Sequence, residues 1–310
     1  MTISFGVEFF EHFRGRRVEQ AESFTEQCLR WSSSLPLCIR IFWDDAFDGD
    51  LLLGPLQALW NPKYKGSERC TSFTWYNNGR DYNGWDRATN QKVIALLPKE
   101  LPSLRHLSLT HFTHITEGTQ IPNCPVLEEV ELLGYYEPNP SCWGTNFAHV
   151  TTLSFGEYGV WASFNTGTLS LFPALRYLTL FTVRSSQHGM LGDPKHAPPF
   201  QHLQTLRVRG DLPPGLLTWF VAPALETLHI EANDFDRTPI ANLCYSFSTS
   251  CLHLYVLLPE PIARTEPHWA TDLSEFVLKC TRIQTLFVSK WMEEKCKTFL
   301  GHSNVILHVL

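Results

Sequence analysis

The sequence predicts an α/β repeat fold, a solenoid in which one curved parallel sheet of about eleven strands is backed by helical or irregular segments. Three observations support this prediction. A short apolar phrase recurs along the chain at a nearly constant interval. Prolines stand just before several of its copies, and no linker that would separate a second domain is evident. Stacked units of this kind share one elongated core.

The recurring phrase is an apolar residue, two variable residues, an apolar residue, one variable residue and a last apolar residue. Leu104-Arg-His-Leu107-Ser-Leu109 is the first clear copy. Six copies begin at positions 104, 127, 150, 175, 203 and 225, so the steps are 23, 23, 25, 28 and 22 and their mean is about 24 residues. Leucine-rich repeats have periods of roughly 20–29 residues. The predicted architecture is therefore a leucine-rich-repeat solenoid, a horseshoe.

The segment before the first copy contains elements of a less regular kind. Residues 18–31 carry Val18, Ala21, Phe24, Cys28 and Trp31 at steps of three and four, which indicates an amphipathic helix. The proline at position 36 should end it, because the residue before proline disfavours helical backbone. The remaining expectations are a strand over 37–43, an acidic loop over 44–50, a helix over 51–60, a strand over 71–76, a loop over 77–84 and a helical segment over 91–97.

From position 101 onward, a proline precedes several strands by a few residues, as at Pro102, Pro125, Pro173 and Pro223. Proline stops a helical turn and sets the chain extended. Two looser copies begin at Cys251 and Ile283, and 305–310 is expected to be an incomplete last strand. We assign residues 1–17 as an N-terminal remnant and residues 18–310 as a single leucine-rich-repeat-like domain.

Side chains alternate between the two faces of a strand, so each phrase names the residues on each face. The last two apolar positions should point into the core, where burial of a leucine or valine contributes about 1.5–3 kcal/mol. The variable positions should point outward. They include acids, aromatic residues and arginines, and aromatic residues and arginine are enriched at binding hot spots. We predict a partner-binding surface at Tyr177, Phe181, Arg207, Arg209, His229, Glu231, Glu129 and Glu131, centred on Tyr177, Phe181, Arg207 and Arg209.

Composition narrows the function classes. Net charge is −6, without the basic footprint of a nucleic-acid-binding protein. No apolar run reaches 18 residues and the first residues lack the pattern of a signal peptide, so no membrane span or secretion is expected. The nine cysteines show no CxxC pair, and no Asn-x-Ser/Thr sequon is present. We expect reduced thiols and a cytoplasmic or nuclear protein.

Several chemical motifs are matched poorly. Asp44-Asp45-Ala-Phe-Asp48 has the DDxxD pattern of terpene and prenyl synthases, in which carboxylates bind magnesium, but that chemistry belongs to an all-helical fold. Calcium-binding spacing is absent, as are HExxH, a P-loop, GxGxxG and GxSxG. The thirteen histidines are interpreted as polar surface. We predict no catalytic residue, no metal and no cofactor.

The order of these features resembles a known family. The stretch Cys28-Leu-Arg-Trp-Ser-Ser-Ser-Leu-Pro-Leu-Cys-Ile-Arg-Ile41 is similar to the junction in mushroom-type fungal F-box proteins, where a helix leads through a Pro-Leu-x-Ile phrase into the first strand of a repeat region. The phrases at 101–109 and 172–180 resemble the repeats of that family. The resemblance covers about residues 18 to 310. It implies recognition of a substrate protein for ubiquitination.

The F-box of that family is a helical module of about forty residues that docks onto a Skp1-type adaptor. Residues 1–17 are too short to hold it, so no F-box is expected here and adaptor docking is in doubt. We predict a non-enzymatic scaffold that binds a protein partner on its concave face. Two alternatives stay open. One is a hydrolase or transferase that uses Ser108 or Ser154 with His106, and the other is a truncated paralogue without a partner.

Overall fold

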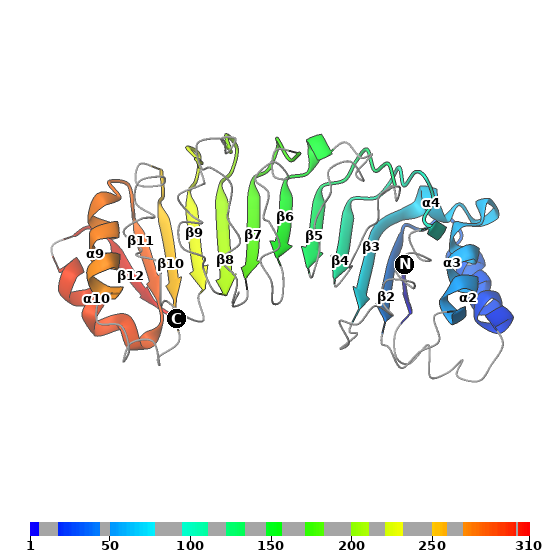
Figure 1. Cartoon of the computed structure of the whole chain (residues 1–310), viewed down its shortest axis with the longest axis horizontal. Helices are drawn as coiled ribbons and strands as arrows, with labels where there is room; N and C mark the ends of the chain where they lie inside the picture. The colour runs from blue at the N-terminus through cyan, green and yellow to red at the C-terminus, as the bar shows by residue number, and fades with distance from the viewer. Residues whose placement is uncertain are drawn as a thin grey trace. The chain divides into compact units, whose positions relative to one another are not determined.

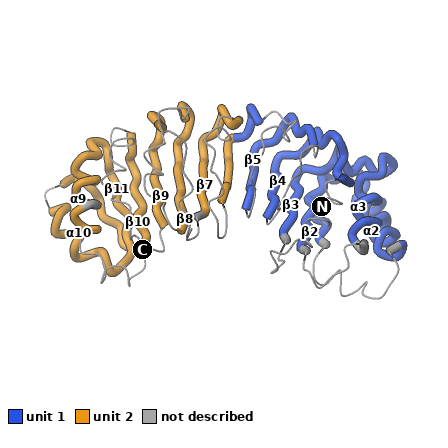
Figure 2. Tube along the Cα trace, in the orientation of Figure 1, with its two compact units in different colours: residues 1–150 blue, residues 151–310 orange. Residues whose placement is uncertain are grey.

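The structure is a computed structural model of the chain. It describes residues 1–5, 18–43, 50–77, 95–110, 122–133, 147–156, 171–182, 200–210, 221–231, 250–258, 269–301 and 303–310. The chain divides into two compact units, residues 1–150 and residues 151–310 (Figure 2). The predicted boundaries, a remnant over 1–17 and one domain over 18–310, stay a prediction.

The described residues of unit 1 contain five strands in chain order, and each pairs in parallel with the next. They are β1 (Thr2–Phe5), β2 (Leu37–Trp43), β3 (Cys70–Asn77), β4 (His106–Thr110) and β5 (Glu129–Leu133). The strands predicted over 37–43 and 71–76 are confirmed. Strand β1 was not predicted, because it lies within residues 1–17, the segment that we assigned as a remnant.

Helical crossovers join the first strands of unit 1, as parallel pairing requires. α2 (Val18–Ser32) follows β1, and α3 (Asp50–Trp60), η1 (Pro62–Tyr64) and α4 (Gly66–Arg69) follow β2. α2 and α3 lie side by side (Figure 1). Both predicted helices are confirmed, and α3 begins at Asp50, a residue that we had placed in the preceding loop. Of the predicted segments, 44–49, 78–84 and 91–94 lie outside the described residues.

The buried stripe of α2 differs from the predicted one. Ala21, Thr25, Leu29 and Ser32 are buried, whereas Phe24 and Trp31 are 46% and 78% exposed. The hydroxyl of Thr25 donates to the carbonyl oxygen of Ala21 at 2.9 Å, and the hydroxyl of Ser32 donates to that of Leu29 at 2.9 Å. Hydroxyls satisfied by their own helix are inexpensive to bury. A prediction based on hydrophobicity therefore chose the wrong face.

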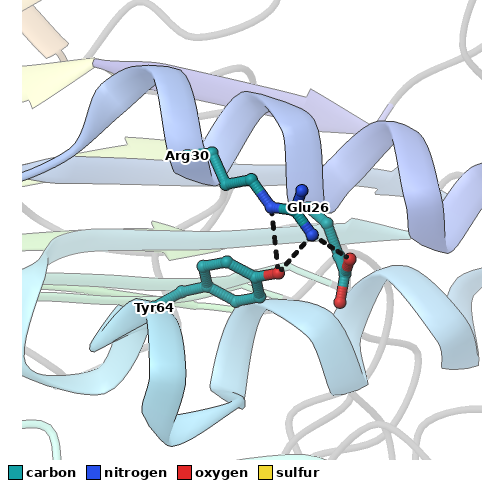
Figure 3. Close-up of polar contacts among 3 residues, drawn as sticks. All are labelled: Glu26, Arg30 and Tyr64. Atoms are coloured by element: carbon teal, nitrogen blue, oxygen red, sulfur yellow. Dashed lines mark hydrogen bonds and ion pairs between the residues drawn. The ribbon is translucent and has the colours of Figure 1, made fainter.

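A polar contact links α2 to the segment after α3. The guanidinium of Arg30 donates through Nε and Nη2 to the hydroxyl oxygen of Tyr64, each at 3.4 Å, and through Nη2 to Oε2 of Glu26 at 3.2 Å (Figure 3). Tyr64 is buried, and it is the last residue of η1. The contact joins the last turn of α2 to η1.

In the described part of unit 2 there are seven strands, again in chain order and parallel to their neighbours (Figure 1). They are β6 (Thr152–Gly156), β7 (Tyr177–Thr182), β8 (Thr205–Gly210), β9 (Thr227–Glu231), β10 (His253–Leu257), β11 (Thr285–Val288) and β12 (Ile306–Val309). Two helices follow the later strands, α9 (Trp269–Lys279) after β10 and α10 (Glu293–Leu300) after β11. Two further 3-10 helices lie among the described residues, η3 (Phe147–His149) in unit 1 and η7 (Lys290–Met292) in unit 2.

The inward rows match the predicted phrase in both units. In unit 1, one row of adjacent strands consists of Ile3, Ile39, Phe73, Leu107 and Val130, all at most 7% exposed. In unit 2, the corresponding row consists of Leu153, Leu178, Leu206, Leu228, Leu254 and Leu286, all at most 1% exposed. Within each unit, strands β1 to β5 and β6 to β11 therefore each contribute one aliphatic or aromatic residue to the buried apolar layer, whereas Leu307 of β12 is only half-buried. Phe155, which we also expected inward, is only half-buried.

Another buried row, absent from the prediction, stands three residues before each phrase for which that position is described. In unit 1 it is Leu101, Cys124 and Phe147, and in unit 2 it is Phe172, Phe200, Ala222 and Cys280. The carbonyl oxygen of each residue accepts a hydrogen bond from the amide three positions later, as from Leu175 to Phe172 at 3.2 Å. Prolines 102, 125, 173 and 223 directly follow four of these residues. The prolines therefore mark tight turns that carry their own core side chain.

Candidate functional site

The outward face of β4 and β5 in unit 1 carries two short polar pairs. Nδ1 of His106 lies 2.9 Å from Oε2 of Glu129, and the hydroxyl of Ser108 donates to Oε2 of Glu131 at 2.6 Å. The register places each pair directly across the two strands. Of the two predicted site residues here, Glu129 is exposed and Glu131 is half-buried.

Two positions of this face are not solvent-exposed, contrary to the prediction. Ser108 is 2% exposed and Thr110 is 5% exposed. The carboxylate of Glu131 accepts a hydrogen bond from the hydroxyl of Ser108. A hydroxyl that donates to a carboxylate cannot donate at the same time to a histidine, which is what a serine nucleophile requires. The two pairs, His106 with Glu129 and Ser108 with Glu131, are therefore polar contacts between neighbouring strands.

The outward face of unit 2 holds the other six predicted residues. We define this face by the strand positions that alternate with the inward rows. They are Thr152, Ser154 and Gly156 in β6, Tyr177, Thr179 and Phe181 in β7, Thr205, Arg207 and Arg209 in β8, Thr227, His229 and Glu231 in β9, His253, Tyr255 and Leu257 in β10, Thr285 and Phe287 in β11, and Ile306 and His308 in β12.

One carboxylate joins both arginines of this face. Oε2 of Glu231 accepts from Nη2 of Arg207 at 3.2 Å and from Nε of Arg209 at 2.9 Å. The three side chains are 34%, 38% and 42% exposed, for Arg207, Arg209 and Glu231 respectively. Ion pairs with this exposure contribute about 0–1 kcal/mol each. Their main effect is therefore to hold the guanidinium groups in place.

The predicted aromatic residues lie beside the arginines. The guanidinium carbon of Arg209 stands 5.7 Å from the ring centroid of Phe181, a cation–π contact. Tyr177 is 47% exposed, the most exposed of the six predicted residues in unit 2. The structure thus brings Phe181, Arg207, Arg209 and Glu231 together, and Tyr177 shares strand β7 with Phe181.

Beyond the arginines, four rings stack across successive strands. His229 and Tyr255 have centroids 5.0 Å apart, Tyr255 and Phe287 4.1 Å apart, and Phe287 and His308 4.6 Å apart. Their planes differ by 22°, 3° and 14°. Residues directly opposite on neighbouring strands are close enough for such contacts. The rings therefore form a continuous row, edge outward.

Sequence reasoning selected only His229 from this row. The signal that was missed is the same position compared across successive copies of the phrase, rather than any one copy. The residue between the last two apolar positions is Arg207, His229, Tyr255 and Phe287 in four successive copies, and the register aligns all four. Aligning the copies would have placed these residues in one column, whereas only the pairing of the strands brings their rings into contact.

The electrostatics of His229 reflect this position. The pKa of His229 is lowered from 6.5 to about 4, mainly by burial and next by the nearby charge of Arg207, with a smaller contribution from Arg209. The carboxylate of Glu231 acts in the opposite sense. Nε2 of His229 and Nε of Arg207 are buried without a hydrogen-bond partner. Near pH 7 the ring is neutral, and the cluster keeps its positive charge on the arginines.

The described residues meet neither the requirements of a metal site nor those of a membrane-spanning helix. No group of three or more histidine, cysteine, aspartate or glutamate side chains there could hold a metal ion. No helix among those residues is long and apolar enough to cross a membrane. Cys70, Cys124 and Cys296 are buried thiols, and burial raises the pKa of each to about 12.

No protein-family model matches the chain, and no curated protein matches it.

Proposed function

We propose that this chain is a leucine-rich-repeat scaffold that binds a protein partner through the outward face of its strands, and that it carries no reaction of its own. The observation that supports this proposal is the outward face of unit 2, where arginines and aromatic rings gather on regularly spaced strands. Arginine and tyrosine are enriched among residues that contribute most to protein binding.

Rigid strands are suited to this role. On β7 to β11 each outward side chain stands on a strand whose inward residues are almost fully buried, as Arg207 stands between Leu206 and Val208. A surface built on such a core loses little conformational entropy when a partner binds. The predicted role of substrate recognition for ubiquitination belongs to this proposal and rests on the family resemblance of residues 18–310 alone.

The enzyme alternative has less support. Its serine, Ser108, donates to Glu131, and its histidine, His106, lies against Glu129. No specific contact of the described residues favours a nucleophile and base over these polar contacts.

Affinity capture with matched variants tests the proposal. The full chain is immobilised and incubated with cell lysate, in parallel with Tyr177→Ala and Arg207→Glu. Two control variants make comparable substitutions at exposed positions outside the outward face. Leu278→Ala removes a large side chain that is 72% exposed on α9, and Arg282→Glu reverses the charge of an exposed arginine. Circular dichroism confirms that each variant is folded.

The proposal predicts at least one protein recovered equally by the wild type and both controls. Each outward-face variant should reduce its recovery about tenfold or more, which corresponds to 1.4 kcal/mol and to a strong interface residue. Recovery of the same proteins in the same amounts by all five chains would contradict the proposal. A truncated paralogue without a partner would give that result.

A further inference from the structure

The outward face of unit 2 has a charge opposite to that of the chain. Among its described strand positions, the charged side chains are Arg207, Arg209 and Glu231, two positive and one negative, so the face carries +1 with histidines neutral. The whole chain carries −6. A positive face on an acidic protein attracts an acidic partner locally without attracting polyanions in general.

Hydrogen-bond donors in this cluster outnumber the acceptors. A guanidinium has five N–H donors. Arg207 donates to Oε2 of Glu231 through Nη2, and its Nε is buried without a partner. Nε2 of His229, on the next strand, is also buried without a hydrogen-bond partner, and the tautomer of the ring decides whether it donates or accepts. The Arg207 side chain is 34% exposed, so a carboxylate bound beside it can accept from its remaining N–H groups and would neutralise the excess charge of the cluster.

The ring row continues from Arg207 in a fixed direction. Arg207, His229, Tyr255, Phe287 and His308 occupy one register row, on strands β8 to β12. We call these five residues the arginine–ring row. The cation stands at one end, and Tyr255 and Phe287 supply apolar surface further along. Both rings are half-buried, so part of each remains accessible.

Strand spacing converts this row into a length. Neighbouring strands lie about 4.8 Å apart, so Arg207 and Phe287, three strands apart, are separated by roughly 14 Å. An extended peptide advances about 3.3 Å per residue. A carboxylate on Arg207 and an apolar side chain on Phe287 therefore come from residues about four or five positions apart.

The same geometry argues against single-stranded nucleic acid. Bases bind proteins by stacking on open aromatic faces. In the arginine–ring row the faces are stacked on one another, at 4.1 Å between Tyr255 and Phe287, and the edges are outward. Two arginines, both tied to Glu231, are also few beside the several phosphate contacts of a nucleic-acid site.

We propose that the arginine–ring row binds an acidic peptide segment of a partner protein, with a carboxylate on Arg207 and an apolar side chain four or five residues away on the rings of Tyr255 and Phe287. This inference rests on the proposed function, since it names the chemistry of the partner that the scaffold binds.

Selection from a random twelve-residue peptide display library against the immobilised full chain tests the inference. Enriched peptides are synthesised with a fluorescent label, and fluorescence anisotropy measures their binding. Each is compared with its amide form, in which every Asp and Glu becomes Asn or Gln. The variants are Arg207→Gln and Phe287→Ser, with Arg282→Gln and Leu278→Ser as controls. A labelled twelve-nucleotide thymidine strand is the nucleic-acid probe.

The inference predicts enrichment of Asp and Glu, with an apolar or aromatic residue four or five positions away. Amide forms, Arg207→Gln and Phe287→Ser should each weaken binding about tenfold or more, and the two controls less than about twofold. Raising the salt concentration should weaken binding, because the contact is partly ionic. The comparison of each peptide with its amide form uses the wild-type chain, so it tests the need for a carboxylate even where a variant fails to fold.

Other results separate the two proposals. Enriched peptides that lack acidic residues but lose affinity with Phe287→Ser would overturn the inference and leave the scaffold function in place. A library without any peptide sensitive to the outward-face variants would overturn the inference, and the affinity capture then decides the scaffold function separately. Binding of the thymidine strand that is lost in Arg207→Gln would also overturn the inference and identify a nucleic-acid site.

Discussion

Replacement of Leu178 tests the inward register of the repeat. Leu178 lies in β7, is 1% exposed, and stands between Leu153 and Leu206 on the neighbouring strands. Leu178→Ala removes three carbon groups, worth about 0.8 kcal/mol each on transfer from water, or about 2.4 kcal/mol. The flanking strands are held by their own hydrogen bonds and cannot collapse fully into the space. The total loss should therefore reach about 3–5 kcal/mol.

Leu178→Asp should be more severe, because it places a carboxylate among apolar side chains without a partner. Thr179→Asp is the matched control. It makes the same substitution one residue along, on the outward face, where the register neighbour is Arg207. We expect a change within about 1 kcal/mol for this variant.

Urea titration measures the free energy of unfolding of each variant. Far-UV circular dichroism and tryptophan fluorescence serve as two probes, and coincident curves establish a single transition. Equal midpoints for Leu178→Asp and Thr179→Asp would refute the inward register and, with it, the assignment of the outward face.

Three further predictions concern single side chains. The pKa of His229 should be about 4 by NMR titration, and Arg207→Gln should raise it because a neighbouring positive charge is removed; a pKa of 6.5 would contradict the burial of the ring. Because this pKa lies below the unfolded value of 6.5, the unfolded chain binds more protons between pH 6.5 and 4, and the free energy of unfolding should therefore fall as pH decreases over that window. Gly156→Ala should destabilise by about 1–3 kcal/mol in urea titration, because its Cβ would stand 2.6 Å from Cβ of Phe181, and an unchanged midpoint would show that the two strands separate easily. The thiol of Cys124, whose pKa burial raises to about 12, should react with a thiol reagent at pH 8 at least about a hundredfold more slowly in the folded chain than in urea.

Strands and inward rows could be predicted because alternation is local. Leu107 and Leu109, or Leu178 and Leu180, are two residues apart on one strand, so the phrase alone places them on one face. The same locality explains the confirmed helices α2 and α3. The prediction was wrong for the buried stripe of α2. There the hydroxyls of Thr25 and Ser32 form hydrogen bonds within the helix, and a count of hydrophobic residues does not detect them.

The candidate site was predicted in part. Arg207, Arg209 and Glu231 were identified as outward residues, but their shared carboxylate was not, since an ion pair between β8 and β9 depends on which rotamers meet. Tyr255 and Phe287 were identified as outward residues and left out of the site. Single residues on separate strands give no sign of stacking until their register is known.

By itself, the sequence determines the period, the strand positions and the residues that face inward, because these follow from local backbone geometry and the burial of apolar side chains. Tertiary structure alone decides which outward side chains meet. Neighbours such as Arg207, His229 and Tyr255 lie more than twenty residues apart in the chain, and only parallel pairing brings them to about one strand spacing. The stacked rings and the arginines joined by Glu231 are products of that pairing.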